Sequence, residues 1–165
     1  MFSAALVAGG VSTGLALWLL HGLVSPVPAD ARGGAAVALA VAAALRDCGA
    51  VRCRLPQRRS LVPREVLDDR RYRGTAMFGY ELGTGVRTRL PTTAPYGLAA
   101  AVLLLATDPS IAVAAGAGFG AGRALTIWAR LAAHGPGAWD AACRRHGRAL
   151  GVVASVALVV GLLGV

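Results

Sequence analysis

The stretch FSAALVAGGVSTGLALWLLHGLV, residues 2 to 24, decides the class of fold. It is almost wholly apolar and reaches the roughly 20 residues that a helix needs to cross a bilayer. A cleaved signal peptide is the alternative, because Ala29-Asp30-Ala31 has the small-x-small form of a cleavage site. No basic residue precedes the run, and the run is long for a signal peptide, so we favour a first transmembrane helix.

Four further apolar runs predict transmembrane helices over residues 33–51, 94–107, 110–131 and 149–165. The turn sequence Thr107-Asp108-Pro109 predicts a helical hairpin between two of them. Residues 74–86 are also apolar but are broken by glycines and by Glu81, which predicts a re-entrant or interfacial half-helix. The expected fold is therefore a single all-α membrane domain over residues 1–165, a polytopic bundle of about five transmembrane helices plus a broken helix.

Composition supports a membrane protein and argues against a soluble one. Hydrophobic residues make up 56% of the chain and charged residues 15%, far from the average of soluble domains. The net charge of +9 comes from 17 basic residues, all of them arginine. They lie in the gaps between apolar runs, so we expect contact with the lipid bilayer and not with nucleic acid.

The placement of the arginines predicts the orientation. The arginine-rich connection, residues 46–92, holds 11 of them, the region from Arg123 to Arg148 holds five, and the connection from Pro26 to Arg32 holds one. The positive-inside rule places the two richer segments in the cytoplasm, with the N-terminus cytoplasmic and the C-terminus external. Within the connection, LVPREVLDDRRYRG (residues 61–74) predicts a short helix lying on an anionic membrane surface.

Two prolines bracket the start of the third predicted span in the sequence Pro91-Thr92-Thr93-Ala94-Pro95. Proline lacks a backbone donor and breaks a helix, so freed backbone groups must face water, protein or a ligand. The hydroxyls of Thr92 and Thr93 are able to satisfy some of them. Two interpretations stay open: a broken-helix ligand site, and a purely structural kink.

This stretch and its surroundings resemble the CcdA/DsbD-type cytochrome c biogenesis family, in which a broken helix contains Pro-Cys-x-x-Pro. The resemblance extends over residues 74–128: FGYELG (78–83) precedes the prolines, YGLAAAVLLLA (96–106) follows them, and GFGAGRAL (118–125) matches a glycine-rich phrase. It implies a CcdA-like helical core. The family's redox cysteine is replaced by Thr92, and a threonine cannot form a disulfide, so thiol chemistry does not carry over to this position.

Other candidate residues are charged or carry thiols. Arg123 lies inside a predicted span, where it either pairs with Glu81 or an anionic substrate, or extends its charge to the interface. The candidate ligand or structural site therefore comprises Pro91, Thr92, Thr93, Pro95, Glu81 and Arg123. The spacing of Cys48, Cys53, Cys143 and His146 allows a zinc site chemically, but their weak spacing favours unreactive cysteines and no cofactor.

No pattern of catalytic residues is visible in the sequence, so we do not expect an enzyme. The leading interpretation is a permease-like carrier, or a helper subunit that associates with a membrane-protein partner or with copies of itself. One alternative is a redox-associated membrane protein that uses Cys48 and Cys53. The other is a structural protein whose arginine-rich connection docks on lipid or on a cytoplasmic partner.

Overall fold

A bundle of α-helices forms the part of the chain that the computed structural model describes, residues 1–51, 72–86, 92–133 and 136–163. The prediction of an all-α fold is confirmed. The helices in these ranges are α1 (Phe2–Val24), α2 (Ala29–Asp47), α4 (Tyr72–Thr84), α5 (Ala94–Leu105), α6 (Pro109–Ala132) and α7 (Pro136–Leu163).

Three of these helices are long and apolar enough to cross a membrane. They comprise Phe2–Val24, Pro109–Ala132 and Trp139–Leu163. The first has the predicted bounds, and the second differs from the predicted 110–131 by one residue at each end. Helix α5 has 12 residues and a length of about 18 Å, so it is too short to cross the hydrocarbon layer alone.

Two predicted boundaries were wrong. Helix α7 begins at Pro136 instead of residue 149, because proline is tolerated in the first turn and the exposed arginines after it are good helix formers. Helix α2 covers 29–47 instead of 33–51, since Pro28 precedes its start and Gly49, with a φ of 84°, follows its end. Helix α4 occupies residues 72–84 within the arginine-rich connection, within two residues of the half-helix predicted over 74–86. Residues 61–71 of the predicted surface helix over 61–74 lie outside the described residues.

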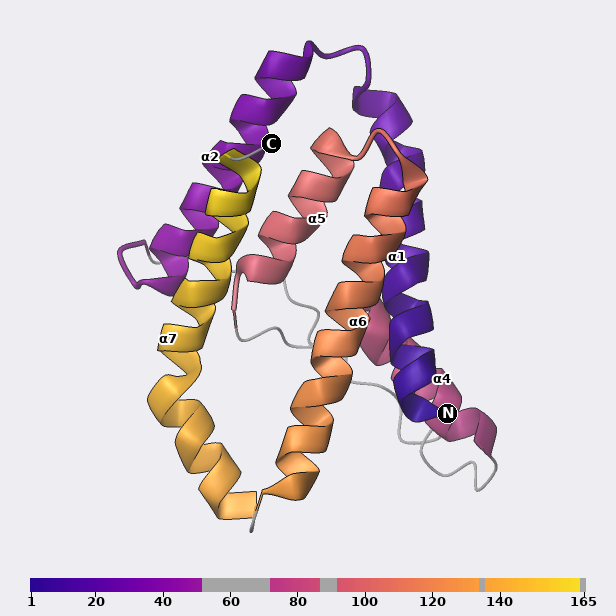
Figure 1. The fold of residues 1–165 in the computed structure, drawn as a ribbon, viewed down its shortest axis with the longest axis vertical. Helices are drawn as coiled ribbons and strands as arrows, with labels where there is room; N and C mark the ends of the chain where they lie inside the picture. The colour runs from indigo at the N-terminus through magenta and orange to yellow at the C-terminus, as the bar shows by residue number, and fades with distance from the viewer. Residues whose placement is uncertain (52–71, 87–91, 134–135, 164–165) are drawn as a thin grey trace.

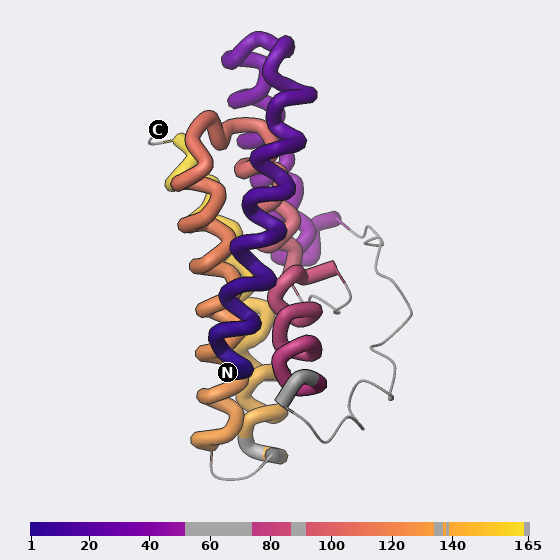
Figure 2. Tube along the Cα trace, turned by 90° about the vertical axis from the view of Figure 1, so that its right-hand side faces the viewer, coloured from indigo at the N-terminus to yellow at the C-terminus, as the bar shows by residue number. Residues whose placement is uncertain are grey.

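Helix α5 lies inside the bundle (Figure 1). It contacts α1 and α6 on one side and α2 and α7 on the other. Helix α4 packs against α1 near the N-terminus, and the tube view shows it beside the first half of α1 (Figure 2). The N-terminus lies in the lower half of the bundle and the end of α7 in the upper half (Figure 1).

Glycines bring α1 and α6 into backbone contact. A Cβ atom added to Gly10 would overlap the carbonyl oxygen of Gly116, and one added to Gly116 would overlap the carbonyl oxygen of Gly10. On the same pair of helices, a Cβ on Gly120 would lie 2.6 Å from the Leu6 carbonyl oxygen. Such close approach increases the dispersion contact between the two helices.

The predicted hairpin between α5 and α6 is present. Asp108 precedes the first residue of α6 and accepts a hydrogen bond of 2.7 Å from the backbone N–H of Ser110. Hydrogen bonds from the Ser110 side chain and backbone lower the pKa of the Asp108 carboxyl. Beneath the turn, a small apolar core of Val102, Ala106 and Ala112 packs against Leu17 and Trp18 of α1.

Candidate functional site

A buried carboxylate holds the start of α5. Both oxygens of Asp47, at the end of α2, accept hydrogen bonds from the backbone N–H of Thr93, at 2.8 and 3.0 Å. The Thr93 hydroxyl donates to Asp47 Oδ1, and the hydroxyl of Ser155 on α7 donates to Oδ2 at 3.1 Å. The Asp47 side chain is 5% exposed, and Ser155 is fully buried. We call these three residues the Asp47 cluster.

Arg46 completes the surroundings of this carboxylate. Its guanidinium donates to the Thr93 hydroxyl at 3.0 Å and lies 3.7 Å from Asp47 Oδ1. The negative carboxylate therefore sits at the N-terminus of α5, where helical N–H groups concentrate partial positive charge. Thr93 does not cap α5 with its own side chain, so Asp47 takes that role.

A positive side chain of α2 contacts the C-terminal end of α5. Arg32, in the first turns of α2, donates to the Leu104 carbonyl oxygen at 3.3 Å and to His21 Nε2 at 3.0 Å. His21 Nδ1 lies 2.9 Å from the Leu103 carbonyl oxygen, which makes it the donating nitrogen when Nε2 accepts from Arg32. These carbonyls belong to the negative end of the α5 dipole. Helix α2 thus carries a charge complementary to each end of α5.

The predicted proline-threonine site is partly described. Pro91 lies outside the described residues. Pro95 occupies the first turn of α5, where its missing N–H costs no helical hydrogen bond. Thr93 is buried in the Asp47 cluster, while Thr92 lines two of the cavities described below. The protein itself therefore satisfies the freed backbone donor at Thr93, whereas Thr92 is half-buried and lines the two cavities with its methyl group close to Gly151 of α7.

The predicted pairing of Arg123 with Glu81 does not form. The Arg123 guanidinium lies over the Phe119 ring, 5.7 Å from its centroid, one turn away on α6. Ion pairs within the described ranges join Arg46 to Asp47 and Arg130 to Asp140. Glu81 is half-buried on α4, which packs against α1 and contacts α6.

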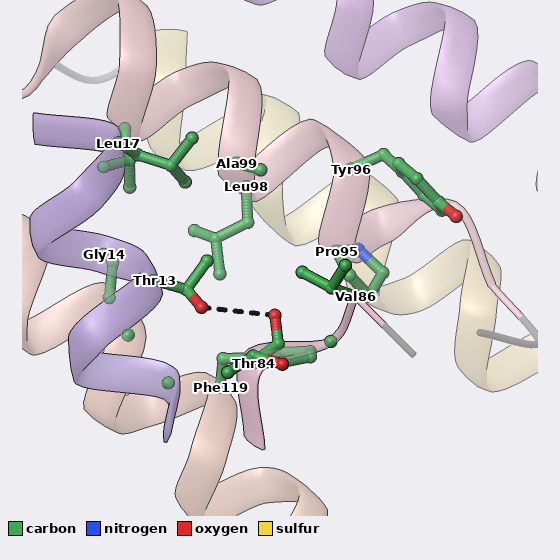
Figure 3. Close-up of a pocket in the computed structure, with 15 residues that line it drawn as sticks. Thr13, Gly14, Leu17, Thr84, Val86, Pro95, Tyr96, Leu98, Ala99 and Phe119 are labelled. Atoms are coloured by element: carbon green, nitrogen blue, oxygen red, sulfur yellow. Dashed lines mark hydrogen bonds between the residues drawn. The ribbon is translucent and has the colours of Figure 1, made fainter. Parts of the chain in front are cut away.

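Three cavities surround α5 and share walls. An apolar cavity of about 310 Å³ lies between α1, α5 and α6, and Figure 3 shows Leu17, Leu98 and Phe119 around it. At its edge the Thr13 hydroxyl donates to the Thr84 carbonyl oxygen at 3.2 Å (Figure 3). A middle cavity of about 680 Å³ shares Pro95, Leu98 and Phe119 with it and also reaches Arg123.

The third cavity is basic. Its volume is about 1130 Å³, and it shares Thr92 and Thr126 with the middle cavity. Arginines from two helices line it: Arg46, Arg144 and Arg148. The three cavities thus form a series. It begins with the apolar cavity between α1, α5 and α6, continues with the middle cavity, and ends with the basic cavity beside the half of α7 that carries the arginines.

The predicted metal ligands do not assemble in the described part of the chain. No group of three His, Cys, Asp or Glu side chains suited to a metal ion occurs among the described residues. Cys48 and Cys143 are free and exposed, and both line the basic cavity, whereas His146 does not. Cys53 lies outside the described residues, which also leaves its predicted redox exchange with Cys48 without a structural description.

Sequence reasoning missed the central residues of this site. Among the residues of the Asp47 cluster it named Thr93, and it did not single out Arg46, Asp47 or Ser155. An acid directly beside an arginine at the end of an apolar run is a usable signal, because a charge placed there needs a partner. Comparison with protein-family models, curated proteins and solved structures returns no match.

Proposed function

We propose that this chain is a multi-pass membrane protein that acts as a permease-like carrier. Its outward surface supports a membrane location, because large apolar side chains are exposed on α1, α6 and α7. Examples are Leu23 at 77%, Leu131 at 71% and Leu163 at 69% exposed. An apolar surface of this extent is costly in water and favourable in lipid. With α2 and the short α5 added to the three long helices, the chain would pass through the bilayer five times, counted from the element order.

The proposed orientation places the N-terminus in the cytoplasm and the C-terminus outside. The arginine distribution supports it. The two termini lie in opposite halves of the bundle, which agrees with an odd number of crossings (Figure 1).

Reporter fusions test this orientation. A reporter that is active only in the cytoplasm should be active when fused after Ser60 or Gly137 and inactive when fused after Val165. The expected cause is the 11 and five arginines that flank the first two positions. An inactive Ser60 fusion together with an active Val165 fusion would reverse the orientation.

The carrier proposal depends on the series of three cavities. Each cavity shares wall residues with the next, and the start of the broken helix lies beside the middle one. The middle cavity is within the usual size of small-molecule sites, roughly 300–1,000 Å³. Broken helices at membrane depth are the usual place where carriers bind their substrates. In this proposal the core is CcdA-like, with Thr92 in place of the redox cysteine and a transport role in place of electron transfer.

Cysteine accessibility tests whether water reaches the cavities. In a cysteine-free background (Cys48, Cys53 and Cys143 to serine), Thr126→Cys and Leu98→Cys should react with a small anionic methanethiosulfonate. Val160→Cys is the control, because Val160 is an exposed apolar position on α7 that lines none of the three cavities and would face lipid. We expect Leu98→Cys to react at least about tenfold faster than Val160→Cys, since the reaction needs the hydrated thiolate. Equal rates would mean a sealed interior and would remove the carrier proposal.

A further inference from the structure

The basic cavity carries an excess of positive charge at its wall. Three arginines line it, and the one acid on its wall, Asp47, is held by the Thr93 and Ser155 hydrogen bonds with a side chain only 5% exposed. The negative charge of Asp47 is therefore directed at the start of α5 and is screened from the cavity. A solute in the cavity meets arginine first.

Two of these arginines are neighbours on one face of α7. Arg144 and Arg148 are four residues apart, so their side chains lie one helical turn apart on the same side. Both are exposed. Like charges at this spacing repel each other, and an anion between them relieves the repulsion. Gly147 also lines the cavity, and the position of its missing Cβ has no atom within 4 Å, so the cavity wall is open at this position beside the two arginines.

The cavity wall also supplies a hydroxyl group. Thr92, just before α5, lines the cavity, and its hydroxyl is able to donate to an anion, whereas the hydroxyl of Thr126 on α6 donates to the Gly122 carbonyl oxygen at 2.9 Å. Guanidinium groups match the oxygen geometry of phosphate and bind it with paired hydrogen bonds. The arginines and the Thr92 hydroxyl that line this cavity supply hydrogen-bond donors of the kind that a phosphate group accepts.

We propose that the basic cavity binds a phosphate-bearing anion between Arg144 and Arg148. The phosphate belongs either to the headgroup of an anionic lipid or to a soluble phosphorylated compound, since the chemistry of recognition is the same. This inference names a ligand class for the basic cavity, the last of the series of three. It rests on the proposed function, because it assumes that this end of the bundle lies at the membrane surface. Binding of the anion to this site is measured directly, in an assay that does not depend on transport.

The exposed thiol of Cys143 on the cavity wall reports occupancy. The wild-type protein is placed in phosphatidylcholine nanodiscs and alkylated with iodoacetamide at increasing pyrophosphate concentration, and the Cys143 peptide is followed by mass spectrometry. A second series replaces part of the phosphatidylcholine with phosphatidylglycerol. We expect at least one of these anions to slow alkylation of Cys143. Protection by pyrophosphate identifies a soluble ligand, and protection by phosphatidylglycerol alone identifies a lipid headgroup.

Charge variants on the same helix locate the site. Arg144→Gln and Arg148→Gln should each raise the half-protecting pyrophosphate concentration by roughly tenfold or more, the loss expected for one charge-assisted hydrogen-bonded contact. Where phosphatidylglycerol is the ligand, both variants should lose its protection. Arg145→Gln removes the same charge from an exposed residue that does not line the cavity, and it should change protection less than about twofold. Unchanged melting temperatures would show that all three variants are folded.

Two results would overturn the inference. The first is no protection of Cys143 by either anion. The second is an equal loss of protection in Arg145→Gln, which would mean attraction by the general positive charge of the protein. Neither result depends on the reactivity of Leu98→Cys, so failure of the anion site and failure of the carrier proposal are separate outcomes.

Discussion

Gly116→Leu is expected to destroy the packing of α1 against α6. A side chain at this position would occupy the space of the Gly10 carbonyl group, and backbone atoms cannot rotate away as a flexible side chain can. The two helices would have to separate along their length. We expect a loss of about 3 kcal/mol or more, at the upper end of the overpacking range. The measurement is the thermal unfolding of purified protein in detergent, together with its elution as a single species.

The control for this variant is Gly118→Leu on the same helix. A Cβ at Gly118 meets nothing within 4 Å, so the larger side chain has room. Replacing a helical glycine favours the helix by about 0.8–1 kcal/mol, and the control should therefore be as stable as wild type or more so. Gly10→Leu, on the partner helix, should reproduce the loss seen with Gly116→Leu. A Gly116→Leu protein with wild-type stability would contradict backbone contact between α1 and α6.

Asp47→Ala is expected to have the second large effect. It removes the acceptor of the Thr93 N–H, the Thr93 hydroxyl and the Ser155 hydroxyl at once, in a site where Ser155 is fully buried. It also leaves Arg46 without its nearby carboxylate. Removing one partner from a buried charged network costs about 3–5 kcal/mol, because the remaining polar groups stay desolvated. Thermal unfolding measures the loss.

A surface ion pair supplies the matched control. Asp140→Ala breaks the Arg130–Asp140 contact of 3.9 Å, whose side chains are 58% and 49% exposed. Such pairs contribute about 0–1 kcal/mol, so this variant should unfold close to the wild-type temperature. Asp47→Asn keeps one acceptor oxygen for the Thr93 N–H and should fall between the two. If Asp47→Ala and Asp140→Ala were equally stable, the Asp47 cluster would not hold the start of α5.

The sequence by itself determined the helical class and the main helical segments. Apolar runs near the length of a bilayer predicted α1 with its observed bounds and α6 within one residue. The predicted helix-breaking turn is also present, since Thr107-Asp108-Pro109 separates the end of α5 from the start of α6. These features are readable because hydropathy, proline and helix caps act over a few neighbouring residues.

The start of α7 shows where local reading fails. The last span was predicted to begin at residue 149, where the apolar run begins, yet the helix begins at Pro136. Hydropathy marks the apolar part of a helix and not its polar first turns, whereas arginine favours helix and the exposed face of the segment tolerates its charge.

Only the tertiary structure decided which residues meet. Helix α1 is apolar on nearly every side, so no periodicity in its sequence distinguishes the glycines that contact α6 from those that do not. The partner of Thr93 is Asp47, 46 residues away, and that of Asp47 is Ser155, 108 residues away. Arg123 lies over Phe119, not beside Glu81, because the direction of a side chain depends on how α6 is rotated against its neighbours. Contacts between distant residues follow from the packing of whole helices, which short-range propensities do not encode.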